Sequence, residues 1–126
     1  MTSEALKAAC LALAGSEETF PFNPETSVFK AGGKVFAISA LGAVPLRVSL
    51  KCDPDLAVRL RAEHPAITGG WHLNKRHWNT VLIDGSVPQT LLLEMIEDSY
   101  DLIVAQLPRR QQLLLDWPGA GRPEGG

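Results

Sequence analysis

Leu46-Arg47-Val48-Ser49-Leu50-Lys51 is the stretch that decides the fold, because apolar and polar side chains alternate along it without a break. Alternate side chains of a β-strand point to opposite faces of its sheet. The three apolar residues therefore predict one buried face, and Arg47, Ser49 and Lys51 share the other. A sheet with helices on one side and water or a partner on the other gives this pattern. The stretch predicts an α+β domain.

A helix is expected directly after this strand. Asp53 can cap the first turn with its side chain, and Pro54 suits the first helical position. The helix ends at His64-Pro65, because proline disfavours a helical conformation in the residue before it. Along this helix the expected core residues are Leu56 and Leu60, and the expected solvated ones are Arg59 and Arg61.

A β-hairpin is expected before the strand. Residues 27–39 contain two short β-rich runs on either side of Gly32-Gly33, a pair that suits a tight turn. With a two-residue loop, Phe29 lies opposite Phe36 on one apolar face. The hairpin then places one cation on its other face and one at its tip: Lys30 and Lys34.

The remaining segments give helices and connectors. Ser3–Ala14 and the long run from Pro88 to about Gln106 have apolar residues at helical spacing. Both phenylalanines of Phe20–Pro24 are expected to pack onto the core. Leu113–Trp117 is too apolar for water, so we expect it to dock on the domain or on a neighbour. Residues 118–126 are rich in Pro and Gly and are expected to be poorly ordered.

The densest chemistry lies in Trp71-His72-Leu73-Asn74-Lys75-Arg76-His77-Trp78-Asn79-Thr80. Lys75 and Arg76 can neutralise phosphates, and Asn74 can hydrogen-bond to bases or sugars. Trp71, His72 and His77 can stack on or position a base. The alternative is structural, with both tryptophans as core anchors and the cations on a wet turn. We expect Asn74-Lys75-Arg76 on a turn between short strands around Trp71 and Trp78.

These motifs carry a family resemblance. Lys51–Pro54, His64–Ile67, His72–Thr80 and Asp84–Pro88 occur in an order that resembles the bacterial MmcQ/YjbR-like family, as does Phe20–Thr26 upstream. The resemblance runs from about Leu6 to Pro108, and it departs at Gly69-Gly70 and after Pro108. It implies a frataxin-like (CyaY-like) domain over residues 1–108, with 109–126 as a C-terminal extension. It also implies a DNA-binding protein that uses a double-wing arrangement, with the hairpin and the 71–80 turn as candidate wings.

Composition sets the limits on these expectations. The chain has 126 residues, 21% charged and 45% hydrophobic, which fits one globular domain. No apolar run is long enough to cross a bilayer, and the first residues give no sign of a secretion signal. Cys10 and Cys52 are far apart and match no metal or redox spacing, so two free thiols in the cytoplasm are expected.

The charge is unevenly distributed along the chain. Net charge is −2, yet residues 30–76 hold eight cations and three anions. A chain of this kind can present one positive face while it stays acidic overall. We therefore expect several cations to converge on one face: Lys30, Lys34, Arg47, Lys51, Lys75 and Arg76.

The sequence favours a binding protein over an enzyme. His72 and His77 are five residues apart, which suits neither a helical metal pair nor one face of a strand. No nucleophile, metal or cofactor motif is found. Cys52 beside Lys51 could be an activated thiol, but one adjacent cation is weak support for that role. The acidic outer face of the long helix is read as solvated rather than as a metal ridge: Glu94, Glu97, Asp98 and Asp101.

We therefore predict one α+β domain with an antiparallel sheet of about five strands and helices packed on one face. Its expected partner is double-stranded DNA, without a cofactor, as a monomer or weak homodimer. Two alternatives stay open: a small-anion or nucleotide module that uses the Asn74–Trp78 turn, and a protein-interaction domain. The predicted nucleic-acid-binding residues are Lys30, Lys34, Arg47, Lys51, Trp71, His72, Asn74, Lys75, Arg76 and His77.

Overall fold

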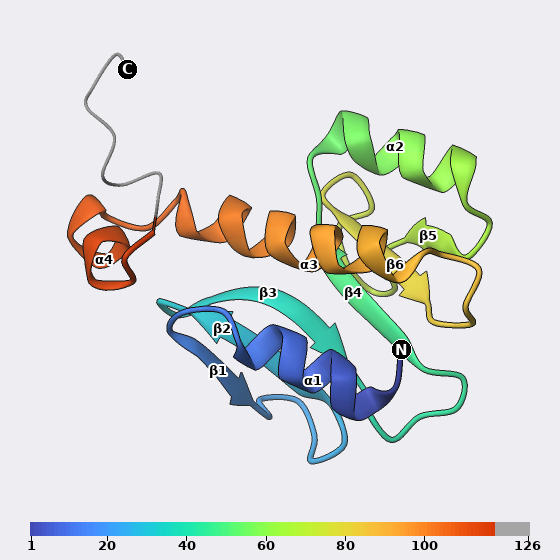
Figure 1. The fold of residues 1–126 in the computed structure, drawn as a ribbon, viewed down its shortest axis with the longest axis horizontal. Coiled ribbons are helices and arrows are strands. Elements are labelled where there is room, and N and C mark those ends of the chain that lie inside the picture. The colour runs from blue at the N-terminus through green and yellow to red at the C-terminus, as the bar shows by residue number, and fades with distance from the viewer. Residues whose placement is uncertain (118–126) are drawn as a thin grey trace.

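Six strands form one antiparallel sheet, in a computed structural model that describes residues 1–117. The order across the sheet is β1-β2-β3-β4-β6-β5 (Figure 1). The expectation of poor order for 118–126 lies outside the described residues. The strands are β1 Ser16–Thr19, β2 Ser27–Ala31, β3 Lys34–Ser39, β4 Arg47–Lys51, β5 Ile67–Gly69 and β6 Trp78–Leu82.

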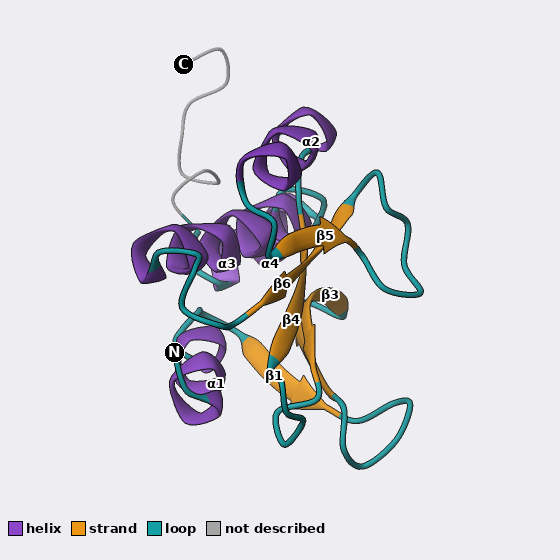
Figure 2. Ribbon diagram, turned by 90° about the vertical axis from the view of Figure 1, so that its right-hand side faces the viewer, coloured by secondary structure: helices purple, strands orange, loops and turns teal. Residues whose placement is uncertain are grey.

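Helices cover one face of this sheet. Figure 2 shows them gathered on one side, while loops project from the other. This arrangement confirms the α+β class and the one-sided cover that the alternation in β4 predicted. The frataxin-like comparison stays a prediction of the family resemblance. The helices are α1 Ser3–Leu11, α2 Pro54–Glu63, α3 Gln89–Val104 and α4 Arg109–Leu114.

The sixth strand, β1, was not expected. Glu17 and Glu18 pair with Lys30 and Phe29 of β2 at the edge of the sheet. Glu18 forms an ion pair with Lys7 at 3.1 Å and accepts a hydrogen bond from Ser27. Charged edge strands of this kind resist pairing with other chains. The same charged residues make the strand hard to predict from the sequence, because they lack the apolar pattern of a buried strand.

The hairpin of β2 and β3 has the expected two-residue turn but a different register. Ala31 pairs with Lys34, whereas a bulge shifts Phe29 from Phe36 to Ala37. An extra residue on one strand lets neighbouring side chains share a face. Phe29 and Phe36 are accordingly both fully buried, with ring centroids 6.5 Å apart.

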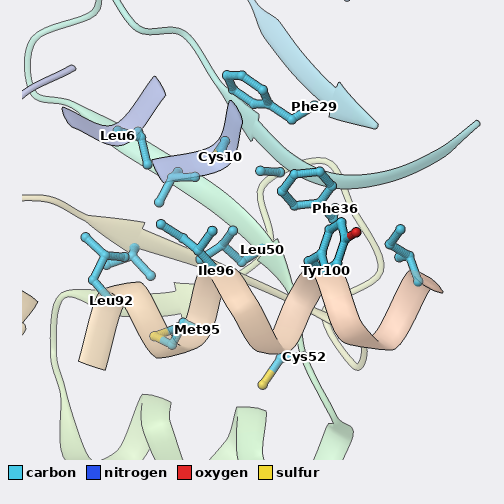
Figure 3. Packing of buried hydrophobic residues seen from close by; sticks show 14 of the residues in the cluster. Leu6, Cys10, Phe29, Phe36, Leu50, Cys52, Leu92, Met95, Ile96 and Tyr100 are labelled. Atoms are coloured by element: carbon cyan, nitrogen blue, oxygen red, sulfur yellow. The ribbon is translucent and has the colours of Figure 1, made fainter. Parts of the chain in front are cut away.

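The core lies between the sheet and α3. Phe36 packs edge-on against Tyr100 at 5.5 Å (Figure 3), a favourable aromatic geometry. Ser99 is fully buried in the same layer because its hydroxyl donates to the Phe36 carbonyl and accepts from the Lys51 N–H. One polar residue of α3 thus joins β3 to β4.

The C-terminal segment docks on the domain, as expected, but two of its apolar side chains stay exposed. Leu113 and Leu114 are 55% and 80% exposed. Leu115 packs against the core and closely approaches Gly15, and Trp117 donates its indole N–H to Asp101. Gln112 donates to the carbonyl oxygens of Val104, Ala105 and Leu107 at the end of α3. Residues 109–117 are therefore attached to the domain.

Candidate nucleic-acid interface

The uncovered face of the sheet carries the polar residues of β4. Val48 and Leu50 point into the helix-covered core, so Arg47, Ser49 and Lys51 point the other way. Ser49 faces Thr80 of β6, and their hydroxyls lie 2.8 Å apart. The cations of β4 are therefore on the open face, as predicted.

The loop between β5 and β6, residues 70–77, folds back over this face. The Trp71 N–H donates to the Thr80 hydroxyl at 3.1 Å. Trp71 belongs to no strand and its side chain is 56% exposed, so its reading as a core anchor within a short strand was wrong. The Arg47 guanidinium lies 4.6 Å from the centre of its ring, which is within the range of a cation–π contact.

The backbone around Trp71 has little freedom. His72 has a φ of 56°, a left-handed conformation that costs a non-glycine residue energy. A Cβ on Gly70 would lie 2.7 Å from the Cβ of Trp78 and 3.1 Å from that of Leu73. Only glycine fits there, so the lead-in that departs from the family resemblance has a steric reason.

A groove runs over the open face beside Trp71. Two adjoining cavities of about 360 and 320 Å³ share Ile38, Ser49, Trp71 and His72 as lining, and together they fall within the size range of ligand sites. Phe22 lines the larger cavity and is 71% exposed. The expectation that Phe22 packs on the core was therefore wrong, and Phe20 is also half exposed.

Hydrogen bonds of Asn74 and Arg61 fix the turn at Asn74-Lys75-Arg76. The side-chain oxygen of Asn74 accepts a hydrogen bond from the Arg76 N–H at 2.9 Å. The backbone carbonyl of Asn74 accepts hydrogen bonds from the N–H groups of His77 and Trp78. Arg61 of α2 donates to the Lys75 carbonyl at 2.7 Å and to the Asn79 side chain at 3.1 Å. Arg61 is thus a positioning residue rather than a solvated one. The sequence of α2 gives no signal of this role, because the partners of Arg61 lie in the 70–77 loop and in β6.

Lys75 faces away from the open face. Gly69 pairs with Asn79, whose side chain donates to Ala57 of α2 on the helix side. The Lys75 Cγ lies 3.0 Å from where a Cβ of Gly69 would be, so the lysine stem crosses the end of β5 on that same side. Its ammonium lies 3.3 Å from the Gly70 carbonyl oxygen.

The six cations consequently do not form the single patch that the charge distribution suggested. Arg47 and Lys51 lie on the open face, whereas the exposed turn with Lys75 and Arg76 bends toward α2. Lys30 lies opposite Glu17, and Lys34 is exposed at the hairpin tip. Sheet topology, which a charge count along the chain cannot show, separates these groups.

Each cation is nevertheless free of a carboxylate partner. Within residues 1–117, the sole side-chain ion pair is between Lys7 and Glu18. Exposed charges without such partners remain available to an external anion. This holds for all six: Lys30, Lys34, Arg47, Lys51, Lys75 and Arg76.

The two thiols are unsuited to catalysis. Burial raises the pKa of Cys10 to about 12. Burial, with Asp53 and Asp98 nearby, raises the pKa of Cys52 to about 11, so the neighbouring Lys51 does not activate it. A thiol with so high a pKa is scarcely ionised at neutral pH and is a poor nucleophile. In the described part of the chain, no three His, Cys, Asp or Glu residues are grouped to hold a metal ion.

No helix in the described part of the chain is both long and apolar enough to span a bilayer.

The fold and this site define a small α+β protein with one open sheet face that bears cations and an exposed tryptophan. A family model described as YjbR matches residues 11–102, and the chain belongs to this family. It is 39% identical over 110 residues to the uncharacterised protein YbdF of Escherichia coli O157:H7, covering 86% of this chain and 89% of that one. It is 34% identical over 115 residues to the uncharacterised protein YjbR of E. coli K12, covering 91% and 98%.

Solved structures share the fold. Protein DR2400 of Deinococcus radiodurans, described with the family-model domain DUF419, matches with a TM-score of 0.87 and 41% identity, covering 99% of this chain and 94% of that one. A protein from Pseudomonas syringae matches with a TM-score of 0.71 and 25% identity, covering 81% and 98%.

Proposed function

We propose that this protein binds DNA without catalysing a reaction, through loop 70–77 and the open sheet face beside it. The observation that carries the proposal is the set of exposed or half-exposed cations without carboxylate partners in the described chain. Phosphate contacts supply most of the non-specific affinity of DNA-binding proteins. An overall charge of −2 does not oppose this, because contacts depend on local charge.

The proposed DNA contacts are of two kinds, phosphate contacts by cations and an aromatic contact by Trp71. Lys75 and Arg76 are adjacent, exposed and mounted on a turn whose backbone Arg61 and Asn74 fix. Two such cations suit successive phosphates rather than base edges. Arg47 and Lys51 offer further positive charge on the open face, and Trp71 offers an aromatic surface between the two regions.

The non-enzymatic part of the proposal has its own support. Catalytic nucleophiles need a lowered pKa or an adjacent base. Both thiols have instead a raised pKa, and neither His72 nor His77 has a side-chain hydrogen bond to an orienting group among the described contacts.

A salt titration of duplex binding tests the proposal. Lys75→Ala with Arg76→Ala should weaken binding to all duplex sequences alike and flatten the slope of log K against log salt by about 2. Melting temperature should change little, because exposed turn charges contribute little to stability. Arg109→Ala with Arg110→Ala is the matched control, since it removes two adjacent exposed cations from α4.

The control variant should keep the affinity and slope of the parent protein. Equal affinity of the Lys75/Arg76 variant and the parent across the titration would overturn the proposed role of the turn. Equal losses in both double variants would mean that general charge, and not this loop, drives the binding.

A further inference from the structure

We infer that the groove beside Trp71 holds one unpaired nucleotide of a single strand, with its base against Trp71 and Phe22 and its phosphate on Arg47. This inference deepens the proposed function, because it names the form of nucleic acid that the open face takes. It also locates that contact away from the turn that would meet duplex phosphates.

The larger cavity has the character of a base site. Trp71 and Phe22 come from loops about fifty residues apart in sequence, and both line this cavity of about 360 Å³ while they remain largely exposed. Exposed aromatic side chains are the usual platform for unpaired bases, because every base has a flat π-face. Ile38 and Leu73 complete an apolar lining.

The adjoining cavity has the character of a phosphate site. Arg47 lines it, and its guanidinium is already placed over the indole of Trp71. No aspartate or glutamate is found among the described residues that line either cavity. The charge of the groove therefore suits an anion, and it disfavours a cationic peptide.

The floor between the two cavities offers a hydrogen-bonding group. Ser49 lines both, and its hydroxyl pairs with that of Thr80, which also accepts the Trp71 N–H. Ser49, Thr80 and Trp71 thus form a chain of hydrogen bonds that connects the floor of the groove to the loop that carries Trp71. A base edge that reaches Ser49 would find a hydroxyl able to donate or accept.

Paired bases cannot use this groove. In a duplex the π-faces are stacked on their neighbours, and extruding one base costs free energy. A single strand presents its bases without that cost, which is why the groove favours it. The apolar cavity with a nearby cation also distinguishes a nucleotide from a bare phosphate ion, which would gain nothing from Trp71 or Phe22.

Anisotropy with a labelled single strand of roughly ten thymidine nucleotides, about one binding site in length, tests this inference. Trp71→Ala and Phe22→Ala should each weaken binding about 5- to 150-fold, the loss typical of one stacking contact. Phe20→Ala is the matched control, because Phe20 lies two residues away, is 50% exposed and lines neither cavity. It should bind as the parent does. Melting curves of all three variants confirm that the fold is kept.

Competition separates the possible sources of the signal. Thymidine monophosphate should displace the strand from the parent protein at concentrations where inorganic phosphate does not. Unchanged single-strand binding in both Trp71→Ala and Phe22→Ala, or equal competition by inorganic phosphate, would overturn the inference. Trp71-dependent single-strand binding by a protein that fails to bind duplex would refute the duplex proposal and leave this inference standing.

Discussion

At the scale of single residues, Gly70 controls where Trp71 lies. It occupies the point at which the chain leaves β5 and turns over the open face, directly against Trp78. The next residue but one, His72, carries the positive φ that completes the turn. From the sequence alone, Gly69-Gly70 suggests a flexible segment. In the structure, Gly70 lies so close to Trp78 that no side chain fits at this position.

Gly70→Ala should therefore destabilise the protein by about 1–3 kcal/mol, because the new methyl group overpacks against Trp78 and Leu73. Chemical denaturation measures this change. Gly42→Ala is the matched control, since a Cβ there meets nothing within 4 Å, and it should be neutral or slightly stabilising. Equal stability of the two variants would show that loop 70–77 moves aside without cost.

At the scale of elements, α2 does more than cover the sheet. Its Arg61 connects the helix to the turn through the Lys75 carbonyl and to β6 through the fully buried side chain of Asn79. The position of the exposed cations therefore depends on a helix that contacts no ligand in the proposed binding mode.

Arg61→Ala should lower stability by about 1–3 kcal/mol, since it leaves a buried amide oxygen of Asn79 without a donor. It should also weaken duplex binding, because the turn loses its support. Arg59→Ala removes the same charge from the same helix at an exposed position without a side-chain hydrogen bond among the described contacts, so it should change neither property. Hydrogen exchange at residues 73–77 offers a direct measurement, with faster exchange expected for Arg61→Ala alone.

At the scale of the whole molecule, regular patterns were predictable and long-range geometry was not. The alternation of β4, the Asp53 cap of α2 and the glycine turn of the hairpin are local signals, and the structure has all three. The β1 strand, the bulge beside Phe29 and the exposure of Phe22 and Trp71 depend on neighbours distant in sequence. The separation of Lys75 from Arg47 was equally unpredictable from the sequence, because it depends on which side of β5 the loop passes.

The whole molecule also places the acidic residues of α3 apart from its open face. The outer face of α3 carries Glu94, Glu97, Asp98 and Asp101. Desolvation, and then repulsion from the other three carboxylates, raises the pKa of Asp98. Helices and open face lie on opposite sides of the sheet (Figure 2). An acidic surface on α3 and the cations Arg47 and Lys51 on the open face explain how a chain with a net charge of −2 can still offer a positive region to the proposed DNA partner.

Glu94→Gln with Glu97→Gln tests this separation, because it raises the formal net charge from −2 to zero without touching the open face. At low salt the variant should bind duplex DNA more tightly than the parent, since long-range repulsion is reduced. Near 0.15 M salt, where screening acts over about 8 Å, the gain should disappear. Losses from Lys75→Ala with Arg76→Ala should persist there, because direct contacts are screened less than distant charges. A gain for the glutamine variant that is equal at both salt concentrations would place α3 in contact with DNA and contradict binding through the open face.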